Sequence, residues 1–175
     1  MLDADIDVLR TAGCSPDVIA HCLKVSKTAL AIADRVKVTH DRELVRKGGL
    51  FHDIGRARTH DIHHALAGVE IGRVLGFSKA LVRIIERHIG AGITASEAER
   101  LGLPRKDYLP RTIEEKLVSY ADNLISGTRE MPFYEALERF RDILGPEHEG
   151  VELFIKQHRE IQGLMNKPET VHNQE

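Results

Sequence analysis

Six histidine and aspartate residues fall on the apolar faces of segments whose spacing predicts helices, and this pattern most limits how the chain can fold. They are His21, His52, Asp53, His64, His88 and Asp122. His21, for example, lies three residues after Val18 and four before Val25, which is helical spacing. A buried carboxylate or imidazole without partners costs free energy. A fold that turns all six side chains inward therefore needs cations among them, and the sequence predicts a metal site inside a helical domain.

His52 and Asp53 stand at the centre of this pattern, in the stretch from Phe51 to Gly55. An apolar segment leads into the pair and a glycine closes the stretch. Neighbouring residues on a helix point about 100° apart. The imidazole and the carboxylate can therefore reach one ion only if it lies against the helix between them. A His-Asp dipeptide is common and alone does not indicate a metal site. The indication comes from the further ligands that other helices are expected to place opposite it.

Helix signals recur along the whole chain. Ser15 followed by Pro16 is typical of a helix start, and Asp41, Ser78 and Thr112 are typical N-terminal caps. The expected helices cover about residues 16–38, 42–55, 63–75, 79–89, 113–125, 132–144 and 147–165, with a short one at 96–101 capped by Ser96. No run of alternating β-branched residues indicates a strand. The expected fold class is all-α.

The composition fits one domain of 175 residues with a net charge of −2. We expect an N-terminal helix or turn at 1–16, the metal-binding core at 17–126, C-terminal helices packing on it at 127–165, and a flexible tail at 166–175. The charge offers no basic field for nucleic acid, so no nucleic-acid partner is expected. No apolar run approaches the roughly 20 residues that span a bilayer, and no signal peptide is evident. We therefore expect a cytoplasmic protein without a membrane partner, with Cys14 and Cys22 reduced.

The order His21, His52-Asp53, His64, His88, Asp122 resembles the HD superfamily of metal-dependent phosphohydrolases, and Asp53-Ile54-Gly55 completes the His-Asp-Ile-Gly form of its central motif. The resemblance covers roughly residues 17–126 and implies a single-domain HD-type helical bundle with the metal site in its core. It also implies that His21, His52, Asp53 and Asp122 hold a first metal ion, and that His64 and His88 hold a second with Asp53 bridging.

The neighbouring His63 shares a wetter helix face with Glu70, which favours His64 as the ligand. Mixed nitrogen and oxygen ligands suit one or two divalent transition-metal ions, and Fe, Mn, Co, Ni and Zn all remain open.

By the same resemblance, the chain would hydrolyse a phosphomonoester or phosphodiester in a small phosphorylated substrate, a nucleotide, through hydroxide that the metal activates. A 5′-nucleotidase, a cyclic-phosphate diesterase and a dinucleoside polyphosphate hydrolase all fit. Asp53 would be catalytic. Arg56 follows it by three residues, where a basic residue often follows this family's motif, and would serve in catalysis and in phosphate binding.

Weaker expectations concern the surroundings of the site. Arg58, on the same loop as Arg56, could bind substrate, as could Arg105 and Lys106 in the segment 90–110. That segment follows His88 and would either cover the site or decorate the surface. A protein acid for the leaving group is not evident, although His60, His63 and Lys116 are candidates.

Two other classes of function stay open from the sequence. One is a di-iron oxygenase on the same scaffold, and the other is a non-catalytic scaffold that binds a nucleotide or a partner. The oligomeric state is also open, because four apolar residues near the C-terminus could pack in the core or against a second subunit of a homodimer. They are Val151, Leu153, Phe154 and Ile161.

Overall fold

The computed structural model describes residues 2–166, and the fold is all-α, as the sequence predicts. The longer helices are α1 (Leu2–Ala12), α2 (Pro16–Ala33), α3 (Arg42–Phe51), α4 (His64–Val74), α5 (Lys79–Arg87), α7 (Ile113–Asn123), α8 (Phe133–Leu144) and α9 (Glu149–Asn166). A short helix α6 (Ala95–Arg100), a 3₁₀ helix η1 (Ile54–Ala57) and the strands β1 (Ile125–Ser126) and β2 (Arg129–Glu130) complete it. Apart from Asn166, the tail expected at 166–175 lies outside the described residues.

Four predicted N-terminal caps are confirmed. The side chains of Ser15, Asp41, Ser78 and Thr112 each accept a hydrogen bond from the backbone N–H three residues ahead. Each bond satisfies a donor that the first turn of a helix leaves free. The starts of α2, α3, α5 and α7 were therefore readable from the sequence.

Other boundaries differ from the prediction. The cap of α6 is Thr94, not Ser96, because the Thr94 hydroxyl accepts from the backbone N–H of Glu97. α2 ends at Ala33 rather than near Val38. The prediction of no strands is also wrong, since β1 and β2 form a two-stranded antiparallel hairpin that pairs Ile125 with Glu130. The hairpin is too short to show an alternating pattern, and it turns at Gly127, whose φ of 61° suits glycine.

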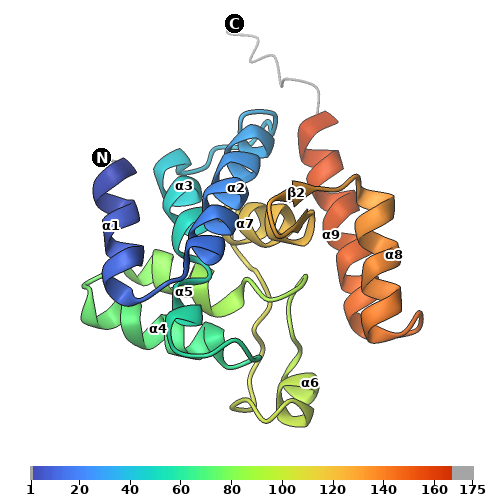
Figure 1. Cartoon of the computed structure of the whole chain (residues 1–175). Coiled ribbons are helices and arrows are strands. Elements are labelled where there is room, and N and C mark those ends of the chain that lie inside the picture. The colour runs from blue at the N-terminus through green and yellow to red at the C-terminus, as the bar shows by residue number, and fades with distance from the viewer. Residues whose placement is uncertain (1, 167–175) are drawn as a thin grey trace, which may run out of the picture.

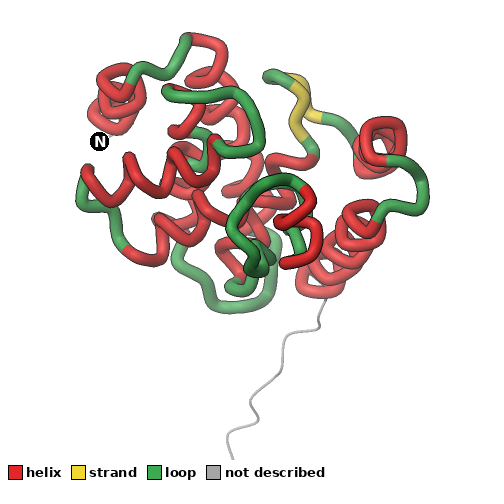
Figure 2. Tube along the Cα trace, turned by 90° about the horizontal axis from the view of Figure 1, so that it is seen from below, coloured by secondary structure: helices red, strands yellow, loops and turns green. Residues whose placement is uncertain are grey.

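The helices form two packed groups that share α2 and α7. Figure 1 shows α1 to α5 gathered on one side, α8 and α9 paired on the other, and α6 set apart on long connections. Seen from below, α6 and its loops lie across the core helices (Figure 2). The largest apolar cluster joins α2 and α7 to α8 and α9. Val151, Phe154 and Ile161 are buried in it and Leu153 packs against it, so these residues serve this chain's own core.

A close approach between η1 and α4 positions the loop that carries Asp53. A Cβ atom on Gly55 would lie 1.8 Å from the carbonyl oxygen of His64 and 2.5 Å from the backbone nitrogen of Gly68. Only a residue without a side chain fits there. The glycine of the central motif therefore brings the start of α4 against the residues that follow Asp53.

Two further expectations concern thiols and membranes. Cys14 and Cys22 are both buried free cysteines, and burial raises the pKa of the Cys14 thiol to about 11. Within the described residues, no helix combines the length and apolar character needed to cross a bilayer.

Candidate metal centre

Five helical elements deliver the six predicted residues to one place. His21 lies within α2, His52 directly follows α3, and Asp53 precedes η1. His64 begins α4, His88 follows α5, and Asp122 is the penultimate residue of α7. His52, Asp53, His64 and His88 are buried, while His21 and Asp122 are partly exposed. The structure thus brings together every residue that the sequence assigned to the metal site.

All four imidazoles are oriented in the same way. The Nδ1 atom of each ring donates a hydrogen bond to a backbone carbonyl: His21 to Gly127 at 2.8 Å, His52 to Gly49 at 2.7 Å, His64 to Asp61 at 2.7 Å and His88 to Ile85 at 2.8 Å. A carbonyl oxygen can only accept, so Nδ1 must carry the proton. In a neutral ring, Nε2 is then left with a lone pair.

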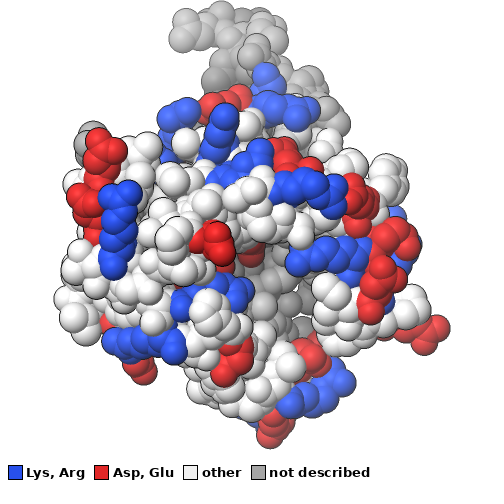
Figure 3. All heavy atoms as spheres, viewed as in Figure 1, with Lys and Arg blue, Asp and Glu red and all other residues white. Residues whose placement is uncertain are grey.

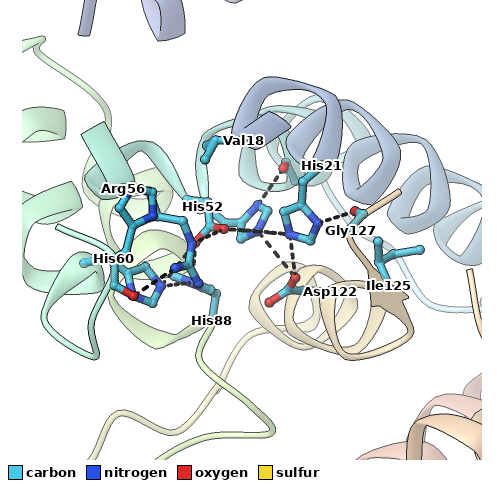
Figure 4. A network of polar contacts seen from close by, with 12 residues as sticks. Val18, His21, His52, Arg56, His60, His88, Asp122, Ile125 and Gly127 are labelled. Carbon is cyan, nitrogen blue, oxygen red and sulfur yellow. Dashed lines mark hydrogen bonds and ion pairs between the residues drawn. The ribbon is translucent and has the colours of Figure 1, made fainter. Parts of the chain in front are cut away.

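These Nε2 atoms converge in two pairs. The Nε2 atoms of His21 and His52 are 3.3 Å apart, and those of His64 and His88 are 3.1 Å apart. Figure 4 shows the rings of His21 and His52 directed at each other and at Asp122. Two lone pairs at such distances repel each other unless a metal ion or a proton lies between them.

Asp53 faces both imidazole pairs with different oxygens. Its Oδ1 lies 3.1 Å from Nε2 of His64 and 3.3 Å from Nε2 of His88. Its Oδ2 lies 3.8 Å from Nε2 of His21 and 3.7 Å from Nε2 of His52. Oδ1 is buried and makes no hydrogen bond. The two oxygens of Asp53 thus face different imidazole pairs.

Asp122 makes its shortest contacts with the first pair. Its Oδ1 lies 3.0 Å from Nε2 of His21 and 3.5 Å from Nε2 of His52. Together with Asp53, it gives the side of His21 and His52 two carboxylates, while the side of His64 and His88 has one. The two halves of the cluster therefore differ in charge.

The electrostatics of the cluster favour positive charge. Burial disfavours ionised carboxylates, but the His52 charge and the nearby imidazoles of His64 and His88 hold the pKa of Asp53 well below its usual range. Burial likewise opposes a charged imidazole, yet Asp53 and Asp122 raise the pKa of His52 to about 9. Burial lowers the pKa of His88.

The donor set fits a divalent metal ion. Three overlapping triads have ligand atoms within 4.8 Å of one another: His21, His52 and Asp53; His52, His88 and Asp122; and Asp53, His64 and His88. The carbonyl bonds at Nδ1 are the usual outer contacts of metal-binding histidines, because they fix the tautomer and the ring orientation. The cluster can therefore hold a metal ion.

The four basic residues predicted to bind substrate have different partners in the structure. The Nε atom of Arg56 donates to Oδ2 of Asp53 at 2.6 Å, and its Nη1 atom donates to the carbonyl of His60 at 3.2 Å. Arg58 pairs with Glu70 at 2.8 Å. Arg105 lies 3.5 Å from Glu99 and Lys106 lies 2.6 Å from Glu86. Of these four basic residues, Arg56 alone contacts the cluster.

A cavity of about 700 Å³ opens over the cluster. His21, Asp53 and Asp122 lie in its wall with Arg56, and so do parts of the segment 90–110, namely residues 90–93, Glu97 and Leu101. Arg105 and Lys106 are not in that wall. Figure 3 shows a hollow on this face with acidic and basic side chains around it. The segment 90–110 thus lines the cavity through residues other than those the sequence singled out.

Of the three candidate acids for a leaving group, only His60 lies in the cavity wall. The exposed ring of His63 instead contacts Asp61, and Lys116 pairs with Glu160.

The sequence analysis missed two contributions from residues beyond Asp122. They are the carbonyl of Gly127, which orients His21, and the face that α8 presents to the cavity. Gly127 could have been noticed as a turn glycine, but no signal in the sequence places α8 beside the cluster.

The fold is a helical bundle, and its helices direct four imidazoles and two carboxylates toward one site. This arrangement is typical of a metal-binding domain. The model of the HD domain matches residues 18–127 of this chain. The chain therefore belongs to the HD domain family, as its central motif predicts.

Relatives of known sequence differ in how much of their length they share. An uncharacterised protein of Methanocaldococcus jannaschii is 50% identical over 155 residues, which cover 87% of this chain and 92% of that protein. The tRNA (cytidine(56)-2′-O)-methyltransferase of Picrophilus torridus is 44% identical over 140 residues, 80% of this chain but 40% of that protein. Ribonuclease Y of Acidothermus cellulolyticus is 33% identical over 144 residues, 78% of this chain and 26% of that protein. The last two names thus belong to much longer proteins.

A solved structure with the same arrangement of helices is the HD domain of the phosphodiesterase PgpH of L. monocytogenes, in complex with cyclic-di-AMP. The TM-score is 0.55, and the match covers 94% of this chain and 98% of that chain. At 16% identity, this likeness establishes the fold alone.

Proposed function

We propose that the protein is a metal-dependent phosphohydrolase that cleaves a phosphomonoester or phosphodiester bond in a small nucleotide. The observation that carries this proposal is the common orientation of the four imidazoles, each donating from Nδ1 to a backbone carbonyl. That orientation points the Nε2 atoms of all four rings toward two carboxylates in a largely buried site, an arrangement that suits metal ligation. Membership of the HD domain family supports the same reading.

In the proposed ligand set, His21, His52, Asp53 and Asp122 hold one ion, and His64 and His88 hold a second with Asp53 shared between the two. The contacts of the two Asp53 oxygens with separate imidazole pairs support this division. When bound, such ions supply Lewis-acid activation of water and charge stabilisation for an in-line displacement at phosphorus. Nitrogen and oxygen ligands favour Fe, Mn, Co, Ni or Zn.

The chain's own residues would position the substrate and handle protons. Arg56 holds the bridging carboxylate of Asp53 through a 2.6 Å bond and lies in the cavity wall, so it both orients Asp53 and faces a bound phosphate. His60, in the same wall, is the candidate that remains for proton donation to the leaving oxygen. The cavity, at about 700 Å³, has the size of small-ligand sites.

Nucleotide substrates are favoured by the cyclic-di-AMP bound to the PgpH domain. Relatives named ribonuclease Y and tRNA methyltransferase favour a second candidate, a phosphodiester at an RNA end. The net charge of −2 argues against a broad RNA surface but not against one terminal nucleotide in the cavity. Short oligoribonucleotides therefore belong in the substrate set.

The test begins with elemental analysis of the purified protein. Anaerobic hydrolysis assays follow, with nucleoside monophosphates, 2′,3′-cyclic nucleotides, diadenosine polyphosphates and short oligoribonucleotides, supplying Mn, Co, Ni, Fe(II) and Zn in turn. We expect hydrolysis of one class that a chelator abolishes. Bound iron with oxygen consumption and no hydrolysis would instead indicate an oxygenase, and neither metal nor hydrolysis would indicate a binding scaffold.

Two adjacent histidines provide a matched pair of variants. His64→Gln removes a buried imidazole from the cluster, while His63→Gln changes an exposed ring that contacts only Asp61. We expect His64→Gln to lower both metal content and hydrolysis at least tenfold. His63→Gln should leave metal content unchanged, and equal losses in the two variants would contradict the assignment.

A further inference from the structure

One face of α8 lines the cavity over the metal cluster. Arg139, Phe140, Ile143 and Leu144 all lie in the cavity wall, together with His21, Asp53 and Asp122 of the cluster. Their spacing of one, four and five residues places them on one side of the helix. All four lie beyond residues 18–127, the part that matches the HD domain. This face is therefore a feature of the C-terminal helices and not of the matched family core.

The core holds α8 in a fixed position. Ala136 and Leu137 are buried in the main apolar cluster. The ring of Phe140 stacks on Phe154 of α9 with centroids 4.4 Å apart, and its edge lies against Gly90, two residues after His88. Side chains on the cavity side of α8 thus have a defined place relative to the cluster.

Arg139 differs from the other arginines around it. Arg141 pairs with Glu138 and Arg129 pairs with Glu135. Arg139 has no carboxylate partner among the described residues, and its only hydrogen bond is a 3.4 Å donation to the carbonyl of Ile125. Ile125 belongs to the hairpin whose turn residue Gly127 orients His21. The guanidinium of Arg139, which has no carboxylate partner among the described residues, thus contacts the hairpin that orients His21.

The other arginine of the cavity wall is already engaged. Arg56 donates to Asp53 and to the carbonyl of His60. No lysine is present in that wall, as far as residues 2–166 show. Arg139 is therefore the cation of the wall that can bind an anion without giving up a carboxylate.

Three apolar side chains share the cavity wall with Arg139 and are exposed. Leu101 is 37% exposed, Ile143 is 67% exposed and Leu144 is 40% exposed, and all three line the cavity. Exposed apolar residues gathered in one concave surface mark a place where an apolar group binds. The flat faces of a nucleobase would suit them.

We propose that this face of α8 binds the distal half of a nucleotide that carries two phosphate groups, while the reacting phosphate lies at the metal cluster. Arg139 binds the second phosphate, and Ile143 and Leu144 contact the nucleoside attached to it. This inference rests on the proposed function, since it assumes that a phosphate is held at the cluster. It narrows the substrate class to dinucleotides and nucleotides with a diphosphate or longer chain.

Phosphate binding by Arg139 can be measured without turnover. Inorganic phosphate and methylenediphosphonate, which is not hydrolysed, are titrated calorimetrically into the Mn²⁺-loaded protein. Because the diphosphonate also chelates Mn²⁺, the informative quantity is the change in its affinity on mutation. Arg139→Gln should weaken diphosphonate binding about tenfold or more, the value of one charge-assisted bond. Arg141→Gln is the matched control, because Arg141 lies on the same helix and pairs with Glu138 outside the cavity wall.

The nucleoside contact has its own matched pair. The methylene analogue of adenosine diphosphate should bind Ile143→Ser several-fold more weakly than the wild type, while methylenediphosphonate alone should bind both equally. Tyr134→Ser is the control, since Tyr134 is 78% exposed on α8 but does not line the cavity. In turnover, Arg139→Gln should raise KM for two-phosphate substrates and leave kcat unchanged.

The outcomes separate the two proposals. Equal effects of Arg139→Gln and Arg141→Gln on diphosphonate binding would overturn the α8 subsite even if the protein hydrolyses nucleotides. Selective loss in Arg139→Gln without hydrolysis of any nucleotide would support the subsite and contradict the phosphohydrolase.

Discussion

At the scale of single residues, the position of Asp53 leads to a prediction about metal content. Its Oδ1 faces His64 and His88 while its Oδ2 faces His21 and His52, whereas the shortest contacts of Asp122 are with the second of these pairs. Asp53→Asn should therefore remove both ions, and Asp122→Asn should remove about one equivalent. Elemental analysis of the two purified variants checks this. Equal metal content in both would contradict a bridging role for Asp53.

The same scale shows what the sequence could reveal about the site. His21, His64, His88 and Asp122 were identifiable because each interrupts an apolar helix face, and that pattern survives in the folded chain. Arg58, Arg105 and Lys106 were expected near the substrate only because they lie close in sequence to motif residues. Their actual partners are Glu70, Glu99 and Glu86, which lie 12, 6 and 20 residues away along the chain, at distances a local pattern does not reach.

At the scale of elements, the contact between η1 and α4 makes Gly55 irreplaceable. A methyl group there would collide with the backbone of His64 and Gly68, and neither can move without shifting the start of α4. Gly55→Ala should lower the free energy of unfolding by about 3 kcal/mol. Denaturant unfolding followed by circular dichroism measures the change.

Gly163→Ala provides the comparison. Gly163 lies in α9 with no atom within 4 Å of a Cβ placed on it. Alanine favours a helix over glycine, so this variant should be more stable by about 0.5–1 kcal/mol. A similar loss of stability in both variants would mean that the close approach at Gly55 is not what limits the substitution.

A buried ion pair joins α5 to α7 just before His88. The Nη1 atom of Arg87 donates to both oxygens of Glu115 at 3.2 and 3.0 Å, and Glu115 is only 3% exposed. Glu115→Ala should destabilise the protein by about 3–5 kcal/mol, because it leaves the charge of Arg87 largely buried without a carboxylate partner. The exposed pair of Arg141 and Glu138 serves as control, and Glu138→Ala should cost less than about 1 kcal/mol. Thermal unfolding of the two variants checks both values.

Helix starts were more predictable than helix ends, and the reason is physical. A cap such as Asp41 or Thr112 acts within three residues, so its signal lies in the local sequence. The end of α2 at Ala33, five residues earlier than expected, carries no such local signal. The chain beyond it meets α9 instead, where the backbone N–H of Lys37 donates to the carbonyl of Leu164. Contacts between distant segments set that boundary.

At the scale of the whole molecule, the all-α class and the cluster followed from periodicity, but the cavity did not. Its wall combines residues near Val18 with others on α8, more than a hundred positions later. Helical spacing indicates which face of α8 is apolar and says nothing about which element that face meets. The placement of Arg139 therefore required the folded structure.

The group of six candidate metal ligands also links distant elements of the fold, and this predicts how metal removal affects stability. Its ligands come from α2, the segment between α3 and η1, α4, α5 and α7, so an ion joins elements that lie a hundred residues apart. An ion that binds only the folded state stabilises it by about 2.7 kcal/mol at a free concentration of one hundred times its Kd. The chelator-treated protein should thus unfold at a lower temperature than the metal-loaded protein, and restored metal should recover the difference. Asp53→Asn should show no such shift, because an amide group replaces one of the two bridging oxygens and removes the negative charge. A shift of wild-type size in this variant would place the stabilising ion elsewhere. Calorimetry of both proteins, with and without metal, measures the four unfolding temperatures.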